Sequence, residues 1–276
     1  MIIVSGSRRS GTSMWMQILR AAGLEIIGSA FPSNWAETIR DANPHGFFES
    51  TLTRGIFHRT NPNPSTGNYL FPGQTRHHVV KVFAGGVTRS ELGFLDRVLV
   101  SIRPWQEFTV SLEKLRTISA LAEDLEDSRR QRALLPPIVE WWCDMYRLIR
   151  DASTRLYPIH FQPYPRLLAD PEKELAEIFT WLGVGDAKKA ARAIDLSLYR
   201  SRVVGVPALS GEIPSNLPDA CDALYERVVT RRPLDDSLIR TLNDTHSELV
   251  PLLVGTRARE AEPSLVPQTV ESSSWS

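Results

Sequence analysis

The sequence has little cysteine, no net charge and no long hydrophobic run. Its 276 residues include 2 cysteines, and 32 lysine and arginine residues balance 32 aspartate and glutamate residues. Cys143 and Cys221 lack the spacing of metal sites or redox pairs, so we expect Cys143 to be a buried apolar residue in a reducing compartment. The balanced charge argues against a general binder of nucleic acid or of acidic membranes.

No uninterrupted apolar stretch approaches the roughly 18 residues that a membrane-spanning helix needs. Met1 leads directly into a short apolar segment, without the basic region and hydrophobic core of a secretion signal. The sequence therefore predicts a soluble cytoplasmic protein without a membrane span. A chain of this size buries roughly three quarters of its unfolded surface, so it can fold without disulfides or metal.

Short patterns typical of buried strands alternate with helical patterns. Residues 1–5, MIIVS, form an apolar run that stops at a glycine turn, and residues 24–28 form a second short strand or sheet edge. Three further β-branched runs, at 77–84, 97–104 and 155–162, are too short for helices. This alternation predicts the α/β class, with a parallel sheet and helices on both faces.

Four segments show the apolar spacing of helices. They follow the first glycine turn, Pro104, the proline pair at 136–137, and Asp170. The last pattern is the clearest, because Asp170 can cap the helix, Pro171 suits its first turn, and glycine ends it. We expect Pro104 at the first helical position of its own helix.

Two regions have the composition of loops. Residues 59–76 are rich in Asn, Pro and Gly, and a loop this long inside a domain usually has a function. The end of the chain is polar and contains prolines, which predicts disorder. We therefore predict a single domain at residues 1–256 and a disordered tail at residues 257–276.

The segment GSRRSGTS, Gly6–Ser13, has nearly the P-loop layout G-x-x-x-x-G-K-S/T, but Thr12 stands where the lysine belongs. A glycine turn between a strand and a helix directs backbone N–H groups and the helix dipole at one point, which favours phosphate or sulfate. Thr12 and Ser13 add hydroxyl groups, and Arg8 or Arg9 can supply the missing charge. We therefore predict an anion site in a sheet of the P-loop type.

The predicted strands end in cations where a magnesium-dependent NTPase would place an aspartate. Strand 97–104 carries Arg103 and strand 77–84 carries Lys81, so we expect nucleotide binding without a metal ion. Ser111 lies eight residues after Arg103, on about the same side of a helix, and the pair could hold a second phosphate. A magnesium-dependent kinase or NTPase, and a non-catalytic module that docks an anion, are the alternatives.

Four segments resemble, in order, the motifs of bacterial P-loop sulfotransferases. Residues 9–13, RSGTS, fall on the 5′-phosphosulfate loop pattern K/R-S-G-T-S/T, and residues 97–111 resemble the 3′-phosphate motif. Residues 43–50, NPHGFFES, resemble the N-P-x-G segment that a glutamate closes. Residues 163–184 are similar to the family's Y-x-x-L-x-x-D-P stretch.

The resemblance implies transfer of a sulfuryl group from 3′-phosphoadenosine 5′-phosphosulfate (PAPS) to a hydroxyl or amine of a small-molecule acceptor. The desulfated donor, adenosine 3′,5′-bisphosphate (PAP), is released. PAPS has no β- and γ-phosphates for a P-loop lysine to reach. The residues expected to bind it are Ser7, Arg8, Arg9, Ser10, Gly11, Thr12, Ser13, Arg103 and Ser111. The family's C-terminal R-K-G-x-x-G segment is missing, and Arg200 and Arg202 are the candidates to take its place.

The implied reaction needs charge stabilisation and a base. Arg9 and the loop amides would neutralise charge on the leaving phosphate, and Lys81 is a candidate for contact with the sulfuryl oxygens. Glu49 matches the glutamate of the N-P-x-G segment and is the first candidate for the general base, with the apolar Phe47 and Phe48 beside it. The other candidates for the base are His45, His77 and His78.

We expect the acceptor wall and lid between residues 35 and 76. The aromatic residues expected to line it are Phe31, Trp35, Phe47, Phe48, Tyr69 and Phe71. This composition favours an apolar or aromatic acceptor that carries a hydroxyl, although the same side chains would also suit a core.

Overall fold

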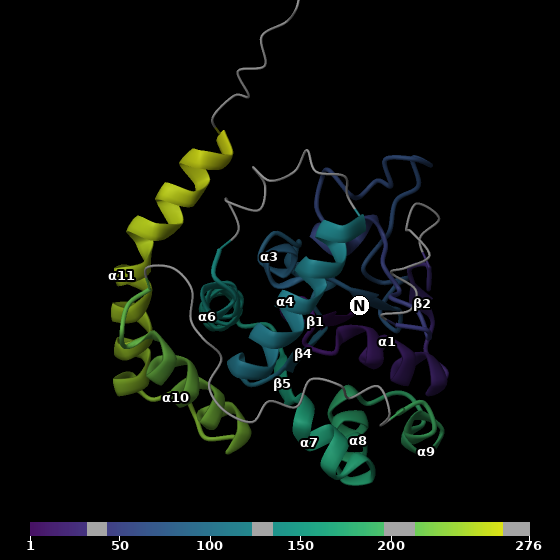
Figure 1. The fold of residues 1–276 in the computed structure, drawn as a ribbon. Helices are drawn as coiled ribbons and strands as arrows, with labels where there is room; N and C mark the ends of the chain where they lie inside the picture. Colours follow the sequence, from purple (N-terminus) through teal and green to yellow (C-terminus); the bar gives the residue numbers. More distant parts are fainter. Residues whose placement is uncertain (32–42, 123–134, 196–212, 262–276) are drawn as a thin grey trace, which may run out of the picture.

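A five-stranded parallel sheet forms the centre of the computed structural model, which describes residues 1–31, 43–122, 135–195 and 213–261 (Figure 1). The strand order is β2-β3-β1-β4-β5, with every neighbouring pair parallel. The strands are β1 (Ile2–Ser5), β2 (Ile26–Ile27), β3 (Val79–Lys81), β4 (Arg97–Ile102) and β5 (Ile159–Pro163). All five overlap predicted strands, and β2 and β5 are the two edges of the sheet.

Helices cover both faces of the sheet, which confirms the predicted α/β class (Figure 1). The described helices of four residues or more are α1 (Thr12–Ala21), α3 (Ala84–Val87), α4 (Trp105–Ala122), α6 (Pro137–Arg155), α7 (Tyr164–Ala169), α8 (Pro171–Leu182), α9 (Ala187–Ala191), α10 (Leu217–Val229) and α11 (Asp236–Ala261). Two short 3₁₀ helices, η1 (Thr51–Arg54) and η2 (Leu92–Phe94), complete the described elements.

Successive strand residues supply two separate cores, because side chains alternate across a strand. Ile2, Val4 and Leu99 pack with α1, α8 and α9 on one face. Ile3 and Val100 pack with α3, α4, α6, α10 and α11 on the other. The sheet is therefore buried on both sides, as its nearly continuous apolar strands predict.

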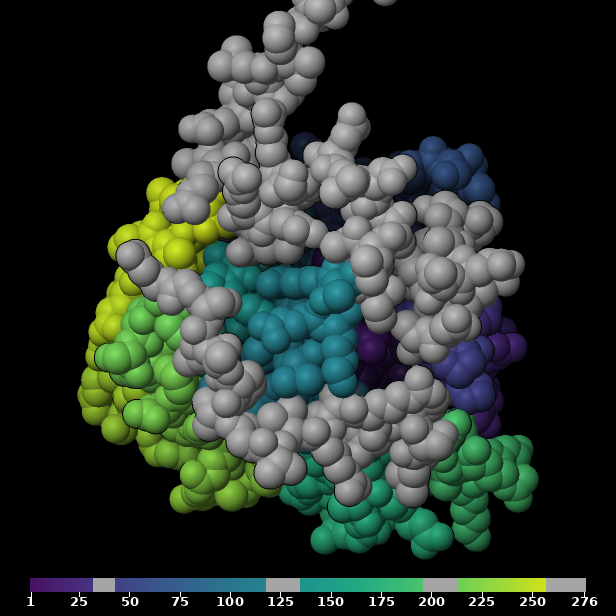
Figure 2. All heavy atoms as spheres, in the orientation of Figure 1, coloured from purple at the N-terminus to yellow at the C-terminus, as the bar shows by residue number. Residues whose placement is uncertain are grey.

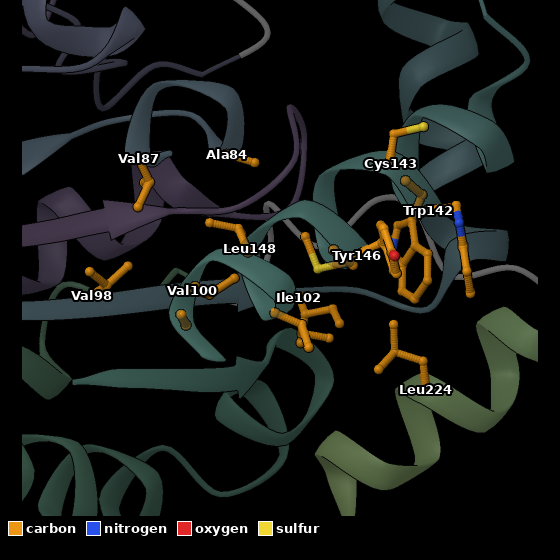
Figure 3. Packing of buried hydrophobic residues seen from close by; sticks show 14 of the residues in the cluster. Ala84, Val87, Val98, Val100, Ile102, Trp142, Cys143, Tyr146, Leu148 and Leu224 are labelled. Carbon is orange, nitrogen blue, oxygen red and sulfur yellow. The ribbon is translucent and has the colours of Figure 1, made fainter. Parts of the chain in front are cut away.

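Helix α6 carries much of the larger core. In Figure 3 its Trp142 and Leu148 gather with Val100 and Ile102 of β4, and Leu224 of α10 points toward them. Both cysteines are buried free thiols, in agreement with the interpretation of Cys143 as a core residue. Burial also raises the pKa of the Cys221 thiol well above its usual value, which keeps that thiol unreactive.

The helix ends agree with the local signals, with one small correction. Asp170 caps α8 by accepting a hydrogen bond from the Lys173 N–H, and Gly183 ends the helix in the left-handed conformation. Pro104, however, precedes α4 and is not its first residue. Its carbonyl accepts the first helical hydrogen bond, from the Phe108 N–H at 3.0 Å, and so it occupies the capping position.

The less regular regions lie mostly where the composition places them. Residues 59–76 form turns, without a helix or strand. Helix α11 continues to Ala261, so the predicted boundary at 256/257 falls inside it, and residues 262–276 lie outside the described residues. Among the helices of the described ranges, none has both the length and the apolar character needed to cross a membrane.

Leu156 follows α6 in the left-handed conformation, with a φ of 58° and a side chain that is 82% exposed. A side chain in this conformation costs roughly 1 kcal/mol and here contributes little packing. We therefore expect Leu156→Gly to raise the free energy of unfolding by about 1 kcal/mol, measured by urea denaturation. Leu92→Gly is the control, because Leu92 is 52% exposed within η2 and lacks a positive φ. A loss of stability in both variants would contradict the argument.

Candidate anion-binding site

One pocket collects most of the predicted site residues. Its volume is about 400 Å³, and it lies at the carboxyl end of the strands, where open parallel sheets bind ligands. Lys81 at the end of β3, Arg103 after β4 and Tyr164 after β5 all reach it. The predicted residues in its lining are Arg8, Arg9, Gly11, Thr12, Ser13, Glu49, Lys81 and Arg103. In Figure 2, purple atoms of the N-terminal segment are visible in a hollow beside the blue-green atoms of α4.

The loop between β1 and α1 lies so close to its neighbours that two positions need glycine. A Cβ atom at Gly11 would stand 2.5 Å from the ring of Tyr164, and one at Gly6 would stand 2.4 Å from the carbonyl oxygen of Ser101. Both glycines also have positive φ angles, 103° and 140°. The Ser101 hydroxyl holds the loop from below by donating a 2.6 Å hydrogen bond to the carbonyl of Ser10.

Two of the predicted donor-binding serines face the protein interior. The Ser10 hydroxyl donates a 2.7 Å hydrogen bond to the carbonyl of Ser7, and both residues are buried. Neither belongs to the pocket lining. Thr12 and Ser13, in contrast, line the pocket at the first turn of α1. The structure therefore places Ser7 and Ser10 as supports of the loop conformation and brings the hydroxyls of the helix start to the pocket.

Arg9 connects the loop with the arginine and the serine of the second predicted phosphate site. It adopts a left-handed conformation with a φ of 65°, and its Nε lies 3.3 Å from Ser111 Oγ. Burial lowers the pKa of Arg9, and the nearby charge of Arg103 lowers it further. The Arg103 guanidinium stacks on Tyr164, with 3.8 Å between Cζ and the ring centre. The two guanidinium groups thus lie close together, and an anion bound between them would stabilise the charged form of both.

Lys81 is a buried cation held in a fixed place. Its side chain is 3% exposed, and its Nζ lies 2.8 Å from the Phe47 carbonyl oxygen, 3.3 Å from Ser13 Oγ and 3.1 Å from Glu49 Oε1. Burial lowers the pKa of Lys81, and the carboxylate of Glu49 opposes this effect. The lysine therefore positions its charge between the helix start and the candidate base.

Glu49 lines the pocket and keeps 22% of its side chain exposed. The predicted apolar surroundings are only partly present. Phe47 shares the lining, but Phe48 is 4% exposed and packs in the core cluster of α1, away from the pocket. The carboxylate instead faces Lys81, because the chain in this region pairs with Ser29 and directs Phe48 inward.

The histidine candidates do not reach the pocket. His45 is exposed, lies 3.5 Å from Asp195 and is not part of the lining. His77 and His78 precede β3, at the end of that strand opposite Lys81, and His78 pairs with Glu25 at 2.7 Å. Their position at the amino end of a parallel strand separates them from the site.

Most of the aromatic residues expected around the acceptor also lie elsewhere. Tyr69 and Phe71 are 60% and 54% exposed and do not contribute to the lining; their rings are tilted, with 6.2 Å between the ring centres. Phe31 does not contribute either. Phe47, Phe83 and Tyr164 are the aromatic residues in the described lining. Trp35, Arg200 and Arg202 lie outside the described residues.

Sequence reasoning missed Asp144 of α6. Although part of this residue is accessible to solvent, protein encloses its carboxyl, and burial raises its pKa to about 7. The carboxyl approaches the Ser7 hydroxyl, but the two groups do not form a hydrogen bond of standard geometry. The charge of Arg8 also acts on it. An acid that follows two tryptophans and a cysteine in the mostly apolar run IVEWWCDMY was the available signal.

Sequence reasoning also missed the role of Tyr164, the first residue of the Y-x-x-L-x-x-D-P stretch. Its ring touches both Gly11 and Arg103, so it joins the glycine loop to the end of β4. No pattern within residues 163–170 reveals this contact, because it depends on the neighbouring positions of β4 and β5 in the sheet.

The comparisons with known proteins are weak. No family model and no curated protein matches the sequence. Among solved structures, the chain is similar to the sulfotransferase domain from the Synechococcus PCC 7002 olefin synthase, with 13% identity and a TM-score of 0.44 over 82% of this chain and 94% of that one. The sulfotransferase domain from the curacin biosynthetic pathway has 12% identity and a TM-score of 0.39 over 82% and 96%. Likenesses at this level do not establish an activity, so the function has to be argued from the pocket.

The raised pKa of Asp144 makes the stability of the protein depend on pH. Its value of about 7 lies above the ordinary 3.8, so between these values the native state holds a proton that the unfolded chain releases. The stability contributed by this group is complete below pH 4 and falls by up to ~1.4 kcal/mol per pH unit until pH 7. We expect Asp144→Asn to gain stability relative to the wild type as the pH rises from 4 to 7, measured by urea denaturation.

The control for this measurement is Asp244→Asn, which removes an exposed carboxylate from α11. This variant should follow the wild type across the same pH range. Parallel curves for the wild type and Asp144→Asn would show that the carboxyl of Asp144 is not destabilised by its surroundings.

Proposed function

We propose that the protein is a PAPS-dependent sulfotransferase, which moves a sulfuryl group to a hydroxyl or amine of a small-molecule acceptor without a metal ion. The observation that carries the proposal is the charge of the pocket. Four cations, Arg8, Arg9, Lys81 and Arg103, share its described lining with two acids, Glu49 and Asp195. This excess of positive charge surrounds a glycine loop at a helix N-terminus, which is itself an anion site.

The residues present fit a donor with two anionic groups. At the helix start, the first backbone N–H groups of α1 have no partner within the helix, and Thr12 and Ser13 add hydroxyls beside them. At the end of β4, Arg103 and Arg9 line the pocket together as a second group of donors. Ser111 is buried behind them, outside the lining, where its Oγ accepts a hydrogen bond from Arg9 Nε. The volume of about 400 Å³ lies within the range of roughly 300–1,000 Å³ for small-ligand pockets.

The ends of the strands favour direct contact between cations and the anion. A magnesium-dependent NTPase needs a carboxylate close to the phosphates. Here Lys81 and Arg103 stand at the ends of β3 and β4, and Glu49 already pairs with Lys81 at 3.1 Å. This donor set supports sulfuryl transfer over the alternative of a magnesium-dependent kinase.

The side chains have separate tasks in the proposed reaction. When bound, the donor supplies the sulfuryl group and its phosphate leaving group. Arg9 and the loop amides would neutralise the charge that grows on the leaving phosphate, while the fixed ammonium of Lys81 would contact the sulfuryl oxygens. Glu49 is exposed enough to meet the acceptor and would take its proton, and the ion pair with Lys81 holds the carboxylate in position.

The remaining lining suits an acceptor with an apolar part. The side chains of Met14, Phe47, Phe83 and Leu115 share the pocket with the charged groups. They come from α1, α4 and the segments around β3, so they surround the donor region on more than one side. We therefore expect the acceptor to be a phenol, an alcohol or an amine attached to a hydrocarbon or aromatic group.

The donor can be tested by thermal unfolding with PAP, compared with ATP in the presence and absence of Mg²⁺. A ligand at a hundred times its Kd stabilises the native state by ~2.7 kcal/mol, which raises the Tm by roughly 5–10 °C for a chain of this size. We expect this shift with PAP, and we expect Arg103→Ala to lose it. The matched control is Arg192→Ala, an exposed arginine after α9 that does not line the pocket and should keep the shift.

The other outcomes of this experiment identify the alternatives. A shift that requires ATP with Mg²⁺ would favour a kinase or NTPase and contradict the sulfotransferase proposal. A shift with PAP in a protein that transfers no sulfuryl group from labelled PAPS to any of a wide panel of phenols, alcohols and amines would favour a non-catalytic anion-binding module.

If Glu49 is the general base, its substitution should greatly lower turnover without weakening donor binding. We expect Glu49→Ala and Glu49→Gln to lower kcat at least a hundredfold, within the ~10²–10⁴ that general base catalysis contributes. The thermal shift with PAP should remain in Glu49→Gln, which keeps the shape of the side chain beside Lys81. Glu25→Gln, an exposed glutamate that pairs with His78, is the control. Turnover close to that of the wild type would remove Glu49 from the mechanism.

A further inference from the structure

A second and larger cavity lies between α6 and α11. Its volume is about 750 Å³, and it shares no described lining residue with the pocket at the glycine loop. Arg147 and Arg150 line it from α6, while His246, Val250 and Val254 line it from α11. On each helix these residues are three or four positions apart, so they lie on one face. The two faces enclose space instead of packing tightly together.

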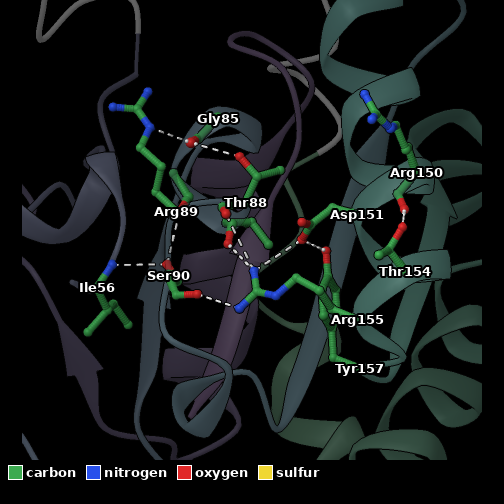
Figure 4. Close-up of polar contacts among 12 residues, drawn as sticks. Ile56, Gly85, Thr88, Arg89, Ser90, Arg150, Asp151, Thr154, Arg155 and Tyr157 are labelled. Atoms are coloured by element: carbon green, nitrogen blue, oxygen red, sulfur yellow. Dashed lines mark hydrogen bonds and ion pairs between the residues drawn. The ribbon is translucent and has the colours of Figure 1, made fainter.

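The carboxylates of this cavity already have partners. Glu140 pairs with Arg116 at 2.8 Å. Asp151 pairs with Arg155 at 3.2 Å and accepts a 2.9 Å hydrogen bond from the Tyr157 hydroxyl (Figure 4). Arg155 is occupied too, because it also donates hydrogen bonds to backbone carbonyls that follow α3. In these ion pairs the negative charges of Glu140 and Asp151 are already compensated by arginines.

Two arginines are left over. Within the described part of the chain, the side chains of Arg147 and Arg150 form no hydrogen bond and no ion pair with any residue. In Figure 4 the guanidinium of Arg150 points away from the Arg155 contacts, and no dashed line reaches it. Both charges act across the cavity, since they lower the pKa of His246 in addition to the larger effect of burial. The cavity therefore has a positive potential, because its carboxylates pair with other arginines and do not compensate Arg147 and Arg150.

The opposite wall is apolar and partly open to solvent. Val250 and Val254 are 45% and 59% exposed, although both are large hydrophobic residues. Behind them the His246 ring stacks on Tyr146 with 4.1 Å between ring centres. His246 Nδ1 is buried, and within the described residues it has no hydrogen-bond partner. The cavity thus offers free cations on α6, and on α11 an apolar surface with an unsatisfied ring nitrogen.

We propose that this cavity is a second binding site, for a small amphipathic anion with a carboxylate or phosphate head on a hydrocarbon chain. Arg147 and Arg150 bind the head group through charge-assisted hydrogen bonds. The chain covers Val250 and Val254, and each methylene that it buries strengthens binding roughly fourfold. Charge complementarity selects this occupant over a neutral or cationic one. The proposal does not depend on the reaction at the glycine loop.

Isothermal titration of the full chain with decanoate and with decyl phosphate tests the proposal. We expect saturable binding of both, about sixteenfold weaker binding of octanoate, which is two methylenes shorter, and no binding of decanol or decyltrimethylammonium. The double variant Arg147→Gln, Arg150→Gln should weaken decanoate binding at least tenfold, and Val254→Asp should abolish it. Because Arg150 and Val254 are exposed and Arg147 is partly exposed, these changes should leave the fold intact, which circular dichroism can verify.

Three control variants test whether decanoate binds in this cavity and not elsewhere on the protein. Arg240→Gln and Ile239→Asp change exposed residues of α11 that do not line the cavity, and both should bind decanoate like the wild type. Arg103→Ala, in the pocket at the glycine loop, should also bind it normally. The proposal is overturned if the wild type does not bind decanoate, if decanol binds equally well, or if Arg103→Ala loses binding while the double glutamine variant keeps it.

Discussion

The close contact of the glycine loop with the ends of β4 and β5 is the constraint on which the candidate site depends. The ring of Tyr164 fills the space beside Gly11, and Ser101 holds the carbonyl of Ser10 from below. This contact fixes the start of α1 above the sheet, so that the first N–H groups of the helix face the same pocket as Arg103. Without this contact, Lys81 and Arg103 at the ends of neighbouring strands would not face the start of α1 in one pocket.

The concentration of positive charge in the pocket disfavours the charged forms of its buried cations. Burial lowers the pKa of both Arg9 and Lys81, and Arg9 also lies near Arg103. The protein compensates only part of this charge, through Glu49 and the Phe47 carbonyl around Lys81. An anionic ligand would compensate the remaining positive charge, because a nearby charge of opposite sign stabilises the charged form of each buried cation. Electrostatics of this kind favours the binding of highly charged groups over neutral ones.

Helix α6 passes close to the glycine loop and also lines the second cavity. Its Asp144 approaches Ser7 under the glycine loop, and Arg147, one turn later, lines the cavity beside α11. On the same helix, Trp142 and Leu148 pack into the larger core with residues of β4. The helix therefore has an apolar side in the core and polar residues that extend from the underside of the glycine loop to the cavity beside α11. A rigid element of this kind keeps the positions of its charges independent of the loops around them.

Local patterns were sufficient for the five strands, the cap of α8 at Asp170 and the glycine loop at Gly6–Ser13, because each depends on residues that are close in the chain. They also placed Lys81 and Arg103 at strand ends, and a parallel sheet brings such ends to one edge. Packing between distant segments decided the rest: that Ser111 contacts Arg9, that Phe48 enters the core, and that Tyr164 lies against the loop. Such contacts depend on which strands and helices become neighbours, and spacing along a sequence contains no record of that.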